Sequence, residues 1–376
     1  MMREHLKRTP LRDEHVALGA RMTEFAGYDM PIQYSGIVAE HDAVRSGVGI
    51  FDVSHMAQFR VFGPGAFDAL QSLVTNDLSR IRGSSLEEGA DELGKAVYTV
   101  ICDEGGGIID DLIVYHSGDI EFLIVANASN RESVGAWLAE RLPDDVELAD
   151  ESDRTALIAV QGPDALRVVS ELAGAGWLPP RRFQLAEGTA DTVPVLYSRT
   201  GYTGEDGVEI FCHESNAVKI WRALLSFPEV VPCGLGARDV LRLEMGYHLY
   251  GLDMDRDTDP VSAGLGWVVK LDKGDFVGRE AIVEVWKQGP SHKLVPLLVE
   301  GGVPRHGMEL VSGRDVVGTI ASGSFSPSLG TGIATAYVPT EYAAEGLELQ
   351  LRIRNKTGRA VVTVPPFVKK TSLTKT

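Results

Sequence analysis

The sequence predicts an α+β protein that ends in a separate all-β segment. Segments with helical spacing of apolar residues alternate with strand-like segments as far as residue 283, and only short strands and turns follow residue 293. The chain has 376 residues, of which 44% are hydrophobic, so it is long enough to bury the cores of two or three domains. A change of composition over 278–293 marks the start of the all-β part.

The helices are predicted from apolar residues that recur every three or four positions, with glycine or proline breaks between segments. The segment 130–142 is expected to be a capped helix, and Gly162-Pro163 separates a strand over 155–161 from the helix that follows. The predicted helical segments are 11–20, 36–46, 65–74, 130–142, 164–172, 216–227 and 234–248.

Strands are predicted in two regions. The segments 96–103, 108–117 and 121–129, of which the first two are joined by a glycine turn, are typical of an antiparallel meander. The C-terminal strands, expected in a small barrel or sandwich, are 294–301, 316–327, 331–338 and 348–355.

The charge and the cysteines limit the classes of function. A net charge of −17 argues against wholesale binding to nucleic acid or to an anionic membrane, because both need a basic surface. Cys102, Cys212 and Cys233 lie far apart and fit no zinc spacing, so reduced thiols in a cytosol-like compartment are expected. No apolar run reaches about 18 residues, so neither a signal peptide nor a membrane span is expected.

The segment 199–210, "RTGYTGEDGVEI", places a carboxylate inside a predicted strand. Glu209 shares a strand face with Phe211, beside a glycine-rich turn that allows close backbone approach. A carboxylate half-buried against an aromatic ring needs a partner. That partner can be a protein cation, a backbone donor or a ligand with paired N–H groups.

Two adjacent carboxylates, Asp110 and Asp111, occupy another predicted strand. Successive strand residues point to opposite faces, so one of them is expected inside if one side of the sheet is covered. A structural Asp that caps a turn or pairs with an arginine is one interpretation. An acid/base or charge-stabilising carboxylate in a cleft is the other.

The helical segment 234–248 places Arg238 and Arg242 four residues apart on one face, near Glu244. A salt-bridged helix is the simple interpretation, and an anion-binding Arg238 at the glycine-rich helix start is the alternative. The acidic loop 252–260 lacks the glycine and the final glutamate of a calcium loop, and His55 fits a structural histidine. The sequence therefore predicts no metal site.

The order of the motifs is more informative than any single motif. From Thr9 to about Val368 the chain resembles the aminomethyltransferase (T-protein) family of the glycine cleavage system. The motifs that carry the resemblance, in order, are "RTPLRDEHVALGARMTEFAGYDMPIQY", "FDVSHM", "TND", "GGIIDDLIVY", "NAS", "QGP", "SRTGYTGEDGVEI", "CGLGARDVLRLE", "LYG", "DFVGREA", "PRHGM" and "SGSFSPSL".

The resemblance implies a three-domain cloverleaf of antiparallel sheets with flanking helices and a C-terminal β-barrel or jelly-roll-like domain, around a central folate hole. The implied divisions are 1–51 with 150–240, 52–149 with 241–283, and 284–376. The implied reaction moves a methylene carbon from the aminomethyl-lipoyl arm of the H-protein to the co-substrate tetrahydrofolate. It releases ammonia and forms 5,10-methylenetetrahydrofolate.

The resemblance also implies the roles of particular residues. Asp111 matches the catalytic carboxylate of the family. Glu209 matches the residue that binds the pterin edge, and Arg238 matches its partner. The remaining residues at positions that line the folate pocket are Tyr98, Asn127, Tyr202 and Trp267. Leu252 departs from the usual asparagine, and the segment 369–376 lacks the family's C-terminal tyrosine.

Folate-dependent demethylases of sulfonium or aryl methyl ether substrates share this fold, so they are the alternative prediction. A non-enzymatic iron–sulfur assembly protein of the same family is a more distant alternative. That relative carries a cysteine in the segment matching "GYTGE", and this chain has no cysteine there.

Overall fold

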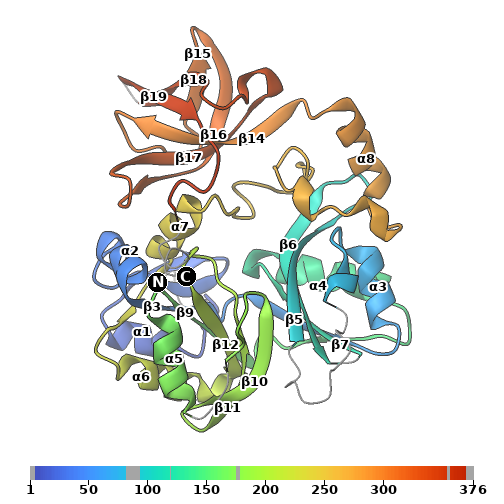
Figure 1. Cartoon of the computed structure of the whole chain (residues 1–376), viewed down its shortest axis with the longest axis vertical. Coiled ribbons are helices and arrows are strands. Elements are labelled where there is room, and N and C mark those ends of the chain that lie inside the picture. Colours follow the sequence, from blue (N-terminus) through green and yellow to red (C-terminus); the bar gives the residue numbers. More distant parts are fainter. Residues whose placement is uncertain (1–4, 82–93, 119, 175–177, 354–355, 370–376) are drawn as a thin grey trace.

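The computed structural model describes residues 5–81, 94–118, 120–174, 178–353 and 356–369. Figure 1 shows three lobes, of which the upper one, drawn in orange and red, contains the last strands of the chain. The lower left lobe contains β3, β9 and β12, and the lower right lobe contains β5, β6 and β7. The α+β class with a C-terminal barrel, predicted from the sequence, is confirmed.

The α-helices in the described part of the chain are α1 (Arg12–Ala17), α2 (Ile37–Ser46), α3 (Ala66–Leu73), α4 (Arg131–Arg141), α5 (Ala165–Ala173), α6 (Ala217–Leu225), α7 (Leu235–Glu244) and α8 (Arg279–Gln288). Short 3₁₀ turns are η1 (Leu78–Arg80), η2 (Ala128–Asn130), η3 (Glu214–Asn216), η4 (Gly266–Val268), η5 (Leu271–Lys273) and η6 (Thr340–Tyr342).

The strands are β1 (Arg21–Phe25), β2 (Tyr28–Gln33), β3 (Val48–Asp52), β4 (Ala57–Phe62), β5 (Gly94–Cys102), β6 (Ile108–Gly118), β7 (Glu121–Ala126), β8 (Glu147–Asp150), β9 (Thr155–Gln161), β10 (Gln184–Ala190), β11 (Val193–Ser198), β12 (Gly207–His213), β13 (Val230–Pro232), β14 (His292–Glu300), β15 (Glu309–Ser312), β16 (Asp315–Ser326), β17 (Thr331–Pro339), β18 (Glu348–Ile353) and β19 (Lys356–Val362).

One sheet of 11 strands, in the order β13-β3-β9-β12-β11-β10-β5-β6-β7-β4-β8, runs through both lower lobes. Among the described residues, which resume at Gly94, two residue pairs join β10 to β5: Gln184 with Lys95 and Leu185 with Gly94. Every other neighbouring pair of strands shares at least three partners. The sheet therefore consists of two halves that meet at a narrow joint.

The first half, β13 to β10, is covered on both faces. Apolar residues of α5 and α6, including Val168, Trp221 and Leu224, pack with β9 and β12 on one face. On the other face, Ala237 and Leu241 of α7 pack with residues of β3 and α2. Alternate residues of the strands enter the two cores, which is why β3 and β12 are buried along almost their whole length.

The second half, β5 to β8, carries α3 and α4 on one face, where Leu70, Trp137 and Leu138 form part of a core with β4 and β6. Val100 on its other face packs with Met254 and Phe276 from the segment after α7. The sheet thus presents one face to helices and the other to the irregular chain that leads to α8.

The barrel is closed in the order β14-β17-β16-β15-β18-β19 around a small core of aliphatic side chains. Closure leaves no free strand edge. The helix α7 lies directly below the barrel in Figure 1 and contacts β16 and β17. This helix therefore touches both the first half-sheet and the barrel.

Most of the predicted helices and strands are present, with shifted ends. The helix expected over 234–248 ends at Glu244, because Gly246 adopts a positive φ of 71°. The β1–β2 hairpin was not predicted from "MTEFAGYDMPIQY". No helix in the described residues is both long enough and apolar enough to cross a bilayer.

Candidate functional site

The pair of carboxylates lies where β6 pairs with β5. Val100 opposes Asp111 and Ile101 opposes Asp110, after which the register shifts so that Ile109 is an extra residue. Such a bulge twists a strand locally and redirects its side chains. Asp110 is fully buried, whereas Asp111 is partly exposed on the opposite face.

Both carboxylate oxygens of Asp111 accept hydrogen bonds. The Tyr98 hydroxyl donates to Oδ2 at 3.0 Å, and Nδ2 of Asn127 donates to Oδ1 at 2.7 Å. Burial raises the pKa of Asp111, and these two donors act in the opposite direction. The carboxylate is therefore held at both oxygens in a site that is partly closed to water.

Trp267 of η4 stacks on the ring of Tyr98, with ring centroids 5.8 Å apart and an interplanar angle of 19°. The Trp267 side chain is 61% exposed, which is unusual for so large an apolar group. The two rings form a flat aromatic wall beside Asp111.

Glu209 lies on β12 at the face that meets α7, as strand alternation predicts. Its side chain is buried, and the Thr200 hydroxyl donates to its Oε2 atom. Burial raises the pKa of Glu209, while Thr200 and the positive charge of Arg238 lower it. The protein cation expected as one possible partner is the nearby Arg238, whereas the Thr200 hydroxyl is a donor that was not expected.

Arg238 projects from the first turns of α7 over the ring of Tyr202, with its guanidinium carbon 4.7 Å from the ring centroid. Its Nη1 atom is buried without a hydrogen-bond partner in the described part of the chain. Burial lowers the pKa of Arg238, and Glu209 opposes that change. A buried guanidinium nitrogen without a partner is costly, so this nitrogen is available to a ligand.

Tyr202 connects the two groups of side chains. The charges of Asp111 and Arg238 both act on its hydroxyl, and burial raises its pKa. Its hydroxyl donates to the main-chain oxygen of His248, and its ring stacks on that of Tyr247 at 5.8 Å. Tyr98, Asn127 and Trp267 thus lie around Asp111. Arg238 lies against Tyr202 and near Glu209, and the electrostatic influence of Asp111 on Tyr202 relates the two groups.

Sequence reasoning missed several members of this constellation. Thr200, which binds Glu209, was visible in the quoted segment, but hydroxyl residues are too common in turns to stand out. Asn130 was expected only as part of a capped helix, yet it makes no side-chain capping bond and donates instead to Asp110 at 2.7 Å. Only the folded chain shows these contacts.

Arg242 and Glu244 of α7 have structural partners. Arg242 is buried and binds Asp253 at 2.7 Å and the Ser322 hydroxyl at 2.8 Å. Glu244 binds Arg45, and it also accepts from Ser326 of the barrel at 2.5 Å. Arg242 also pairs with Asp239 of the same helix at 2.8 Å, so the salt-bridged helix, the simple interpretation of the sequence, is present beside the bonds to neighbouring segments.

Other candidate positions are accounted for structurally. His55 is buried, and burial lowers its pKa to about 4. Within the described residues no cluster of three His, Cys, Asp or Glu side chains could hold a metal ion. Leu252 lies in the turn after α7, and the residues 370–376 lie outside the described part of the chain.

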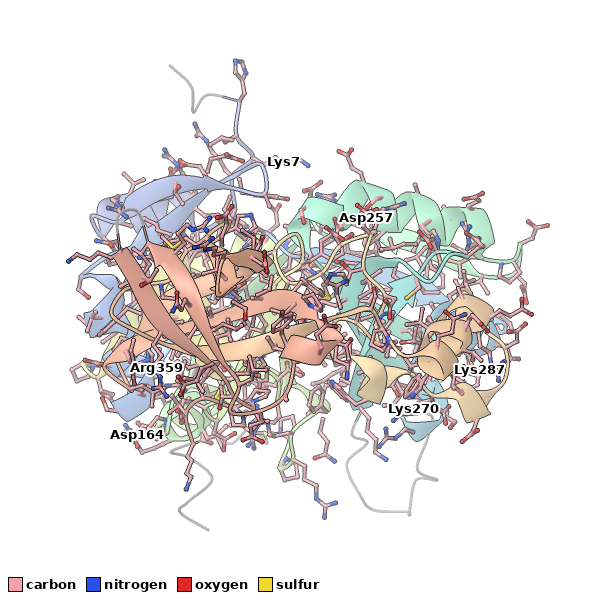
Figure 2. The ribbon with its side chains drawn as sticks, turned by 90° about the horizontal axis from the view of Figure 1, so that it is seen from above. Lys7, Asp164, Asp257, Lys270, Lys287 and Arg359 are labelled. Atoms are coloured by element: carbon pink, nitrogen blue, oxygen red, sulfur yellow. The ribbon has the colours of Figure 1, made fainter. Side chains whose placement is uncertain are left out.

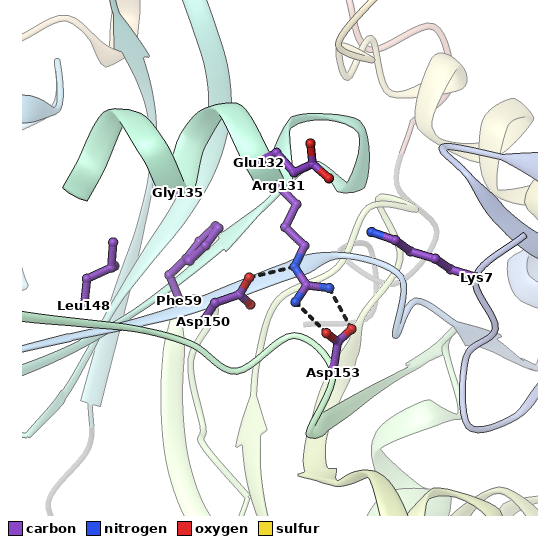
Figure 3. Close-up of a pocket in the computed structure, with 8 residues that line it drawn as sticks. All are labelled: Lys7, Phe59, Arg131, Glu132, Gly135, Leu148, Asp150 and Asp153. Atoms are coloured by element: carbon purple, nitrogen blue, oxygen red, sulfur yellow. Dashed lines mark hydrogen bonds and ion pairs between the residues drawn. The ribbon is translucent and has the colours of Figure 1, made fainter. Parts of the chain in front are cut away.

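A groove of about 490 Å³ lies elsewhere, between the start of the chain and α4 (Figure 3). Arg131 lies in it and is bound by Asp150 and Asp153, each at 2.7 Å. None of the predicted site residues lines this groove, and its central cation is already paired. Figure 2, seen from above, labels the basic residues Lys7, Lys270, Lys287 and Arg359 together with the acidic residues Asp164 and Asp257, so both signs of charge are present in this view.

The site near Asp111 can accept a flat, hydrogen-bonding heterocycle. Aromatic rings supply apolar walls, the carboxylate of Glu209 can accept from adjacent N–H donors, and Arg238 supplies a cation with an unpaired nitrogen. Asp111 adds a second negative group at the other end. A folate fits these groups in chemical character.

Two protein-family models match this chain. Residues 11–273 match the GCVT N-terminal domain family, and residues 292–369 match the glycine cleavage T-protein C-terminal barrel domain family. The aminomethyltransferase of Halothermothrix orenii is 42% identical over 367 residues, covering 96% of this chain and 100% of the relative. That of a Synechococcus species is 44% identical over 374 residues, covering 96% and 98%.

A solved structure, the glycine cleavage system aminomethyltransferase T from Bartonella henselae, matches with a TM-score of 0.88 and 33% identity. The match covers 97% of this chain and 99% of that one. The two domain families cover both parts of the fold, and the similarity extends over nearly the whole chain. The chain therefore belongs to the glycine cleavage T-protein family.

Proposed function

We propose that this chain is the aminomethyltransferase of glycine cleavage. It transfers the methylene carbon from the aminomethyl-dihydrolipoyl arm of an H-protein to tetrahydrofolate, and it releases ammonia and 5,10-methylenetetrahydrofolate. Family membership supports the class of reaction. The observation that carries the assignment of the site is Asp111, held at both oxygens beside the aromatic wall of Tyr98 and Trp267.

Glu209 and Arg238 serve the binding step in this proposal. The pterin edge presents a ring N–H beside an exocyclic amine, which is a donor pair that one carboxylate can accept. Arg238 lies close enough to influence the charge of Glu209 and keeps one nitrogen free. Tyr202, Tyr98, Asn127 and Trp267 line the site beside them.

Asp111 serves the chemical step. The bonds from the carbon to the amino nitrogen and to the lipoyl sulfur break, and bonds to N5 and N10 of tetrahydrofolate form. The two hydrogens lost from N5 and N10 leave on sulfur and ammonia. Positive charge develops near the carbon as ammonia departs, and a nearby carboxylate stabilises it while orienting the folate nitrogen.

The test is turnover with aminomethyl-loaded H-protein and tetrahydrofolate, with ammonia and the folate product identified. The proposal predicts one ammonia released for each 5,10-methylenetetrahydrofolate formed. A demethylase would instead produce 5-methyltetrahydrofolate from a sulfonium or aryl methyl ether donor. Methyl product alone, with no product from the H-protein, would contradict the proposal.

The partners and the location are part of the same proposal. The H-protein is the protein partner, and nucleic acid and membrane are not. A cytoplasmic location agrees with the three cysteines, which are free and buried in the structure.

A further inference from the structure

Asp110, the buried neighbour of Asp111, is linked through hydrogen bonds of Asn127 to Asp111, the candidate catalytic carboxylate. We propose that Asp110 is a positioning residue, which fixes the side-chain amide of Asn127 so that its N–H points at Asp111. This inference rests on the proposed role of Asp111. It differs from both interpretations that the sequence offered for an inward carboxylate, a purely structural Asp and an acid/base group.

Asn127 lies immediately after β7, at the end of the sheet, from where it reaches both faces of β6. Its main-chain N–H donates to Oδ2 of Asp110 at 3.0 Å. Its Nδ2 atom donates to Oδ1 of Asp110 at 2.8 Å and to Oδ1 of Asp111 at 2.7 Å. The two carboxyl groups, on opposite faces of one strand, are therefore joined by a single amide.

The number of hydrogens on Nδ2 makes this arrangement directional. The amide nitrogen of Asn127 carries two hydrogens, so one binds Asp110 and the other binds the carboxylate of Asp111. The second hydrogen also points at the main-chain oxygen of Asp111, which lies 3.1 Å from Nδ2. A reversed amide would place its oxygen against the oxygens of both carboxyl groups. Asp110, as an acceptor on one side, therefore selects the orientation that serves Asp111.

Asp110 is itself held in place by a further donor. Nδ2 of Asn130 donates to its Oδ1 atom at 2.7 Å, although Asn130 stands at the N-cap position of α4, where its side chain makes no capping bond. Capping by asparagine normally stabilises a helix. The side chain is used for Asp110 instead, and this supports a role for Asp110 beyond filling the core.

The burial of Asp110 also indicates a role beyond stability. Its side chain is fully buried with three N–H donors and no cation bound to it in the described residues. Burial raises the pKa of Asp110, and the charge of Asp111 raises it further. Burying a carboxyl group at such a position carries a larger desolvation penalty than burying an apolar residue of similar size.

The experiment is a double-mutant cycle on turnover with Asp110→Asn, Asn127→Ala and the combined variant. In Asp110→Asn, the new side-chain amide points an N–H group at the N–H donors that bound the carboxylate. The side-chain amide of Asn127 therefore loses the acceptor that fixed its orientation. We expect Asp110→Asn to lower kcat by about 10- to 100-fold with little change in the KM for tetrahydrofolate. In the Asn127→Ala background the same substitution should cost no more than about twofold, because Asp110 then has no route to Asp111.

The matched control is Asp52→Asn in the other half-sheet. Asp52 is also a buried carboxylate with three donors, Thr9, His15 and the Ser54 main chain, and it has no bond to the site. Asp52→Asn should lower the melting temperature. The effect of Asn127→Ala on kcat should be the same whether or not Asp52→Asn is present. The proposal is overturned if the effects of Asp110→Asn and Asn127→Ala on kcat are additive. It is also overturned if Asp110→Asn unfolds under conditions where Asp52→Asn stays folded, because Asp110 then serves the core.

A crystal structure of Asp110→Asn gives a readout that does not depend on activity. The inference predicts that the Asp111 carboxylate moves away from Asn127 or becomes disordered, and an unchanged Asp111 contradicts it. Absence of turnover in the unmodified protein would count against the proposed function alone, because this structural comparison would still test the positioning role.

Discussion

Asp111 carries the chemical step in the proposed function, so its charge is the property to remove. Asp111→Asn keeps the shape of the side chain but removes the negative charge that stabilises the developing cation. We expect turnover to fall by about 10²-fold or more, with a modest change in folate affinity, because the interaction strengthens in the transition state. Turnover at saturating folate and binding calorimetry measure the two quantities. Full turnover in a folded variant would remove Asp111 from the mechanism.

Glu209 is expected to act in binding. In Glu209→Gln an amide donor faces the donors of the pterin edge, and one charged hydrogen bond is lost. The expected loss in binding free energy is about 2–4 kcal/mol, measured by calorimetry with tetrahydrofolate. Glu187→Gln on β10, which is separated from β12 by β11 and where the side chain is exposed, is a control for the change of charge. Equal affinity of the two variants would place Glu209 outside the pocket.

At this scale the sequence predicted the charged residues better than their neighbours. Glu209, Arg238 and Asp111 were visible because charged groups in strand or glycine-rich contexts need a physical explanation. The contacts of Thr200 and Asn130 depend on residues distant in the sequence or on a choice between two partners, such as capping α4 or binding Asp110. Local patterns do not resolve such a choice.

The helix α7 offers a comparison between a site arginine and a structural one. Arg238→Ala removes a half-buried side chain with an unpaired nitrogen, so we expect lost folate affinity and turnover with little change in melting temperature. Arg242→Ala leaves the buried carboxylate of Asp253 without its cation, which typically costs about 3–5 kcal/mol of stability. Thermal melts and turnover of the two variants measure this difference. If both variants simply unfold, the division of roles is wrong.

At the scale of elements, the sequence predicted the regular segments and missed those set by tertiary contacts. Helices such as α5 and α6 have strong apolar periodicity and were predicted close to their observed ends. The short strands β1, β8 and β13 have weak patterns and exist because a partner strand lies beside them. The bulge in β6 could not be predicted, because a shift of one residue leaves no mark in the hydrophobic pattern.

At the scale of the whole molecule, Glu244 joins α7 to the barrel, and its contribution depends on pH. Burial opposes ionisation, but hydrogen bonds from His41 and Ser326 lower its pKa from 4.5 to about 2. A lowered pKa means that the charged form stabilises the folded state above pH 4.5 and that this stabilisation is lost as the pH falls through about 2. The shift corresponds to about 3 kcal/mol.

Glu244→Gln should therefore lower the melting temperature clearly at pH 7 and by roughly half as much at pH 3, which lies between the two pKa values, as measured by thermal unfolding. The control is Glu348→Gln, which removes an exposed carboxylate paired with Arg359 in the barrel and should have a small effect at either pH. A drop of equal size at pH 3 and pH 7 would show that the ionised form of Glu244 is not what stabilises the junction.

The all-β character of the C-terminal part was predictable because strands and turns follow one another without helices. The division of the remainder was implied only by the family resemblance, and the ranges 1–51 with 150–240, 52–149 with 241–283, and 284–376 stay a proposal. The separate apolar cores of the two half-sheets support it. Limited proteolysis with mass spectrometry would test those boundaries.

The strand order has a consequence for the way the chain folds during synthesis. β3 lies between β9 and β13, so Val48–Asp52 must remain unpaired until residues 155–161 and 230–232 have left the ribosome. The strands β4 to β8, by contrast, pair among themselves before β9 is made. The inserted half-sheet is therefore expected to become protected from hydrogen exchange first, and the apolar strand β3 is the segment most exposed to aggregation while the nascent chain is incomplete.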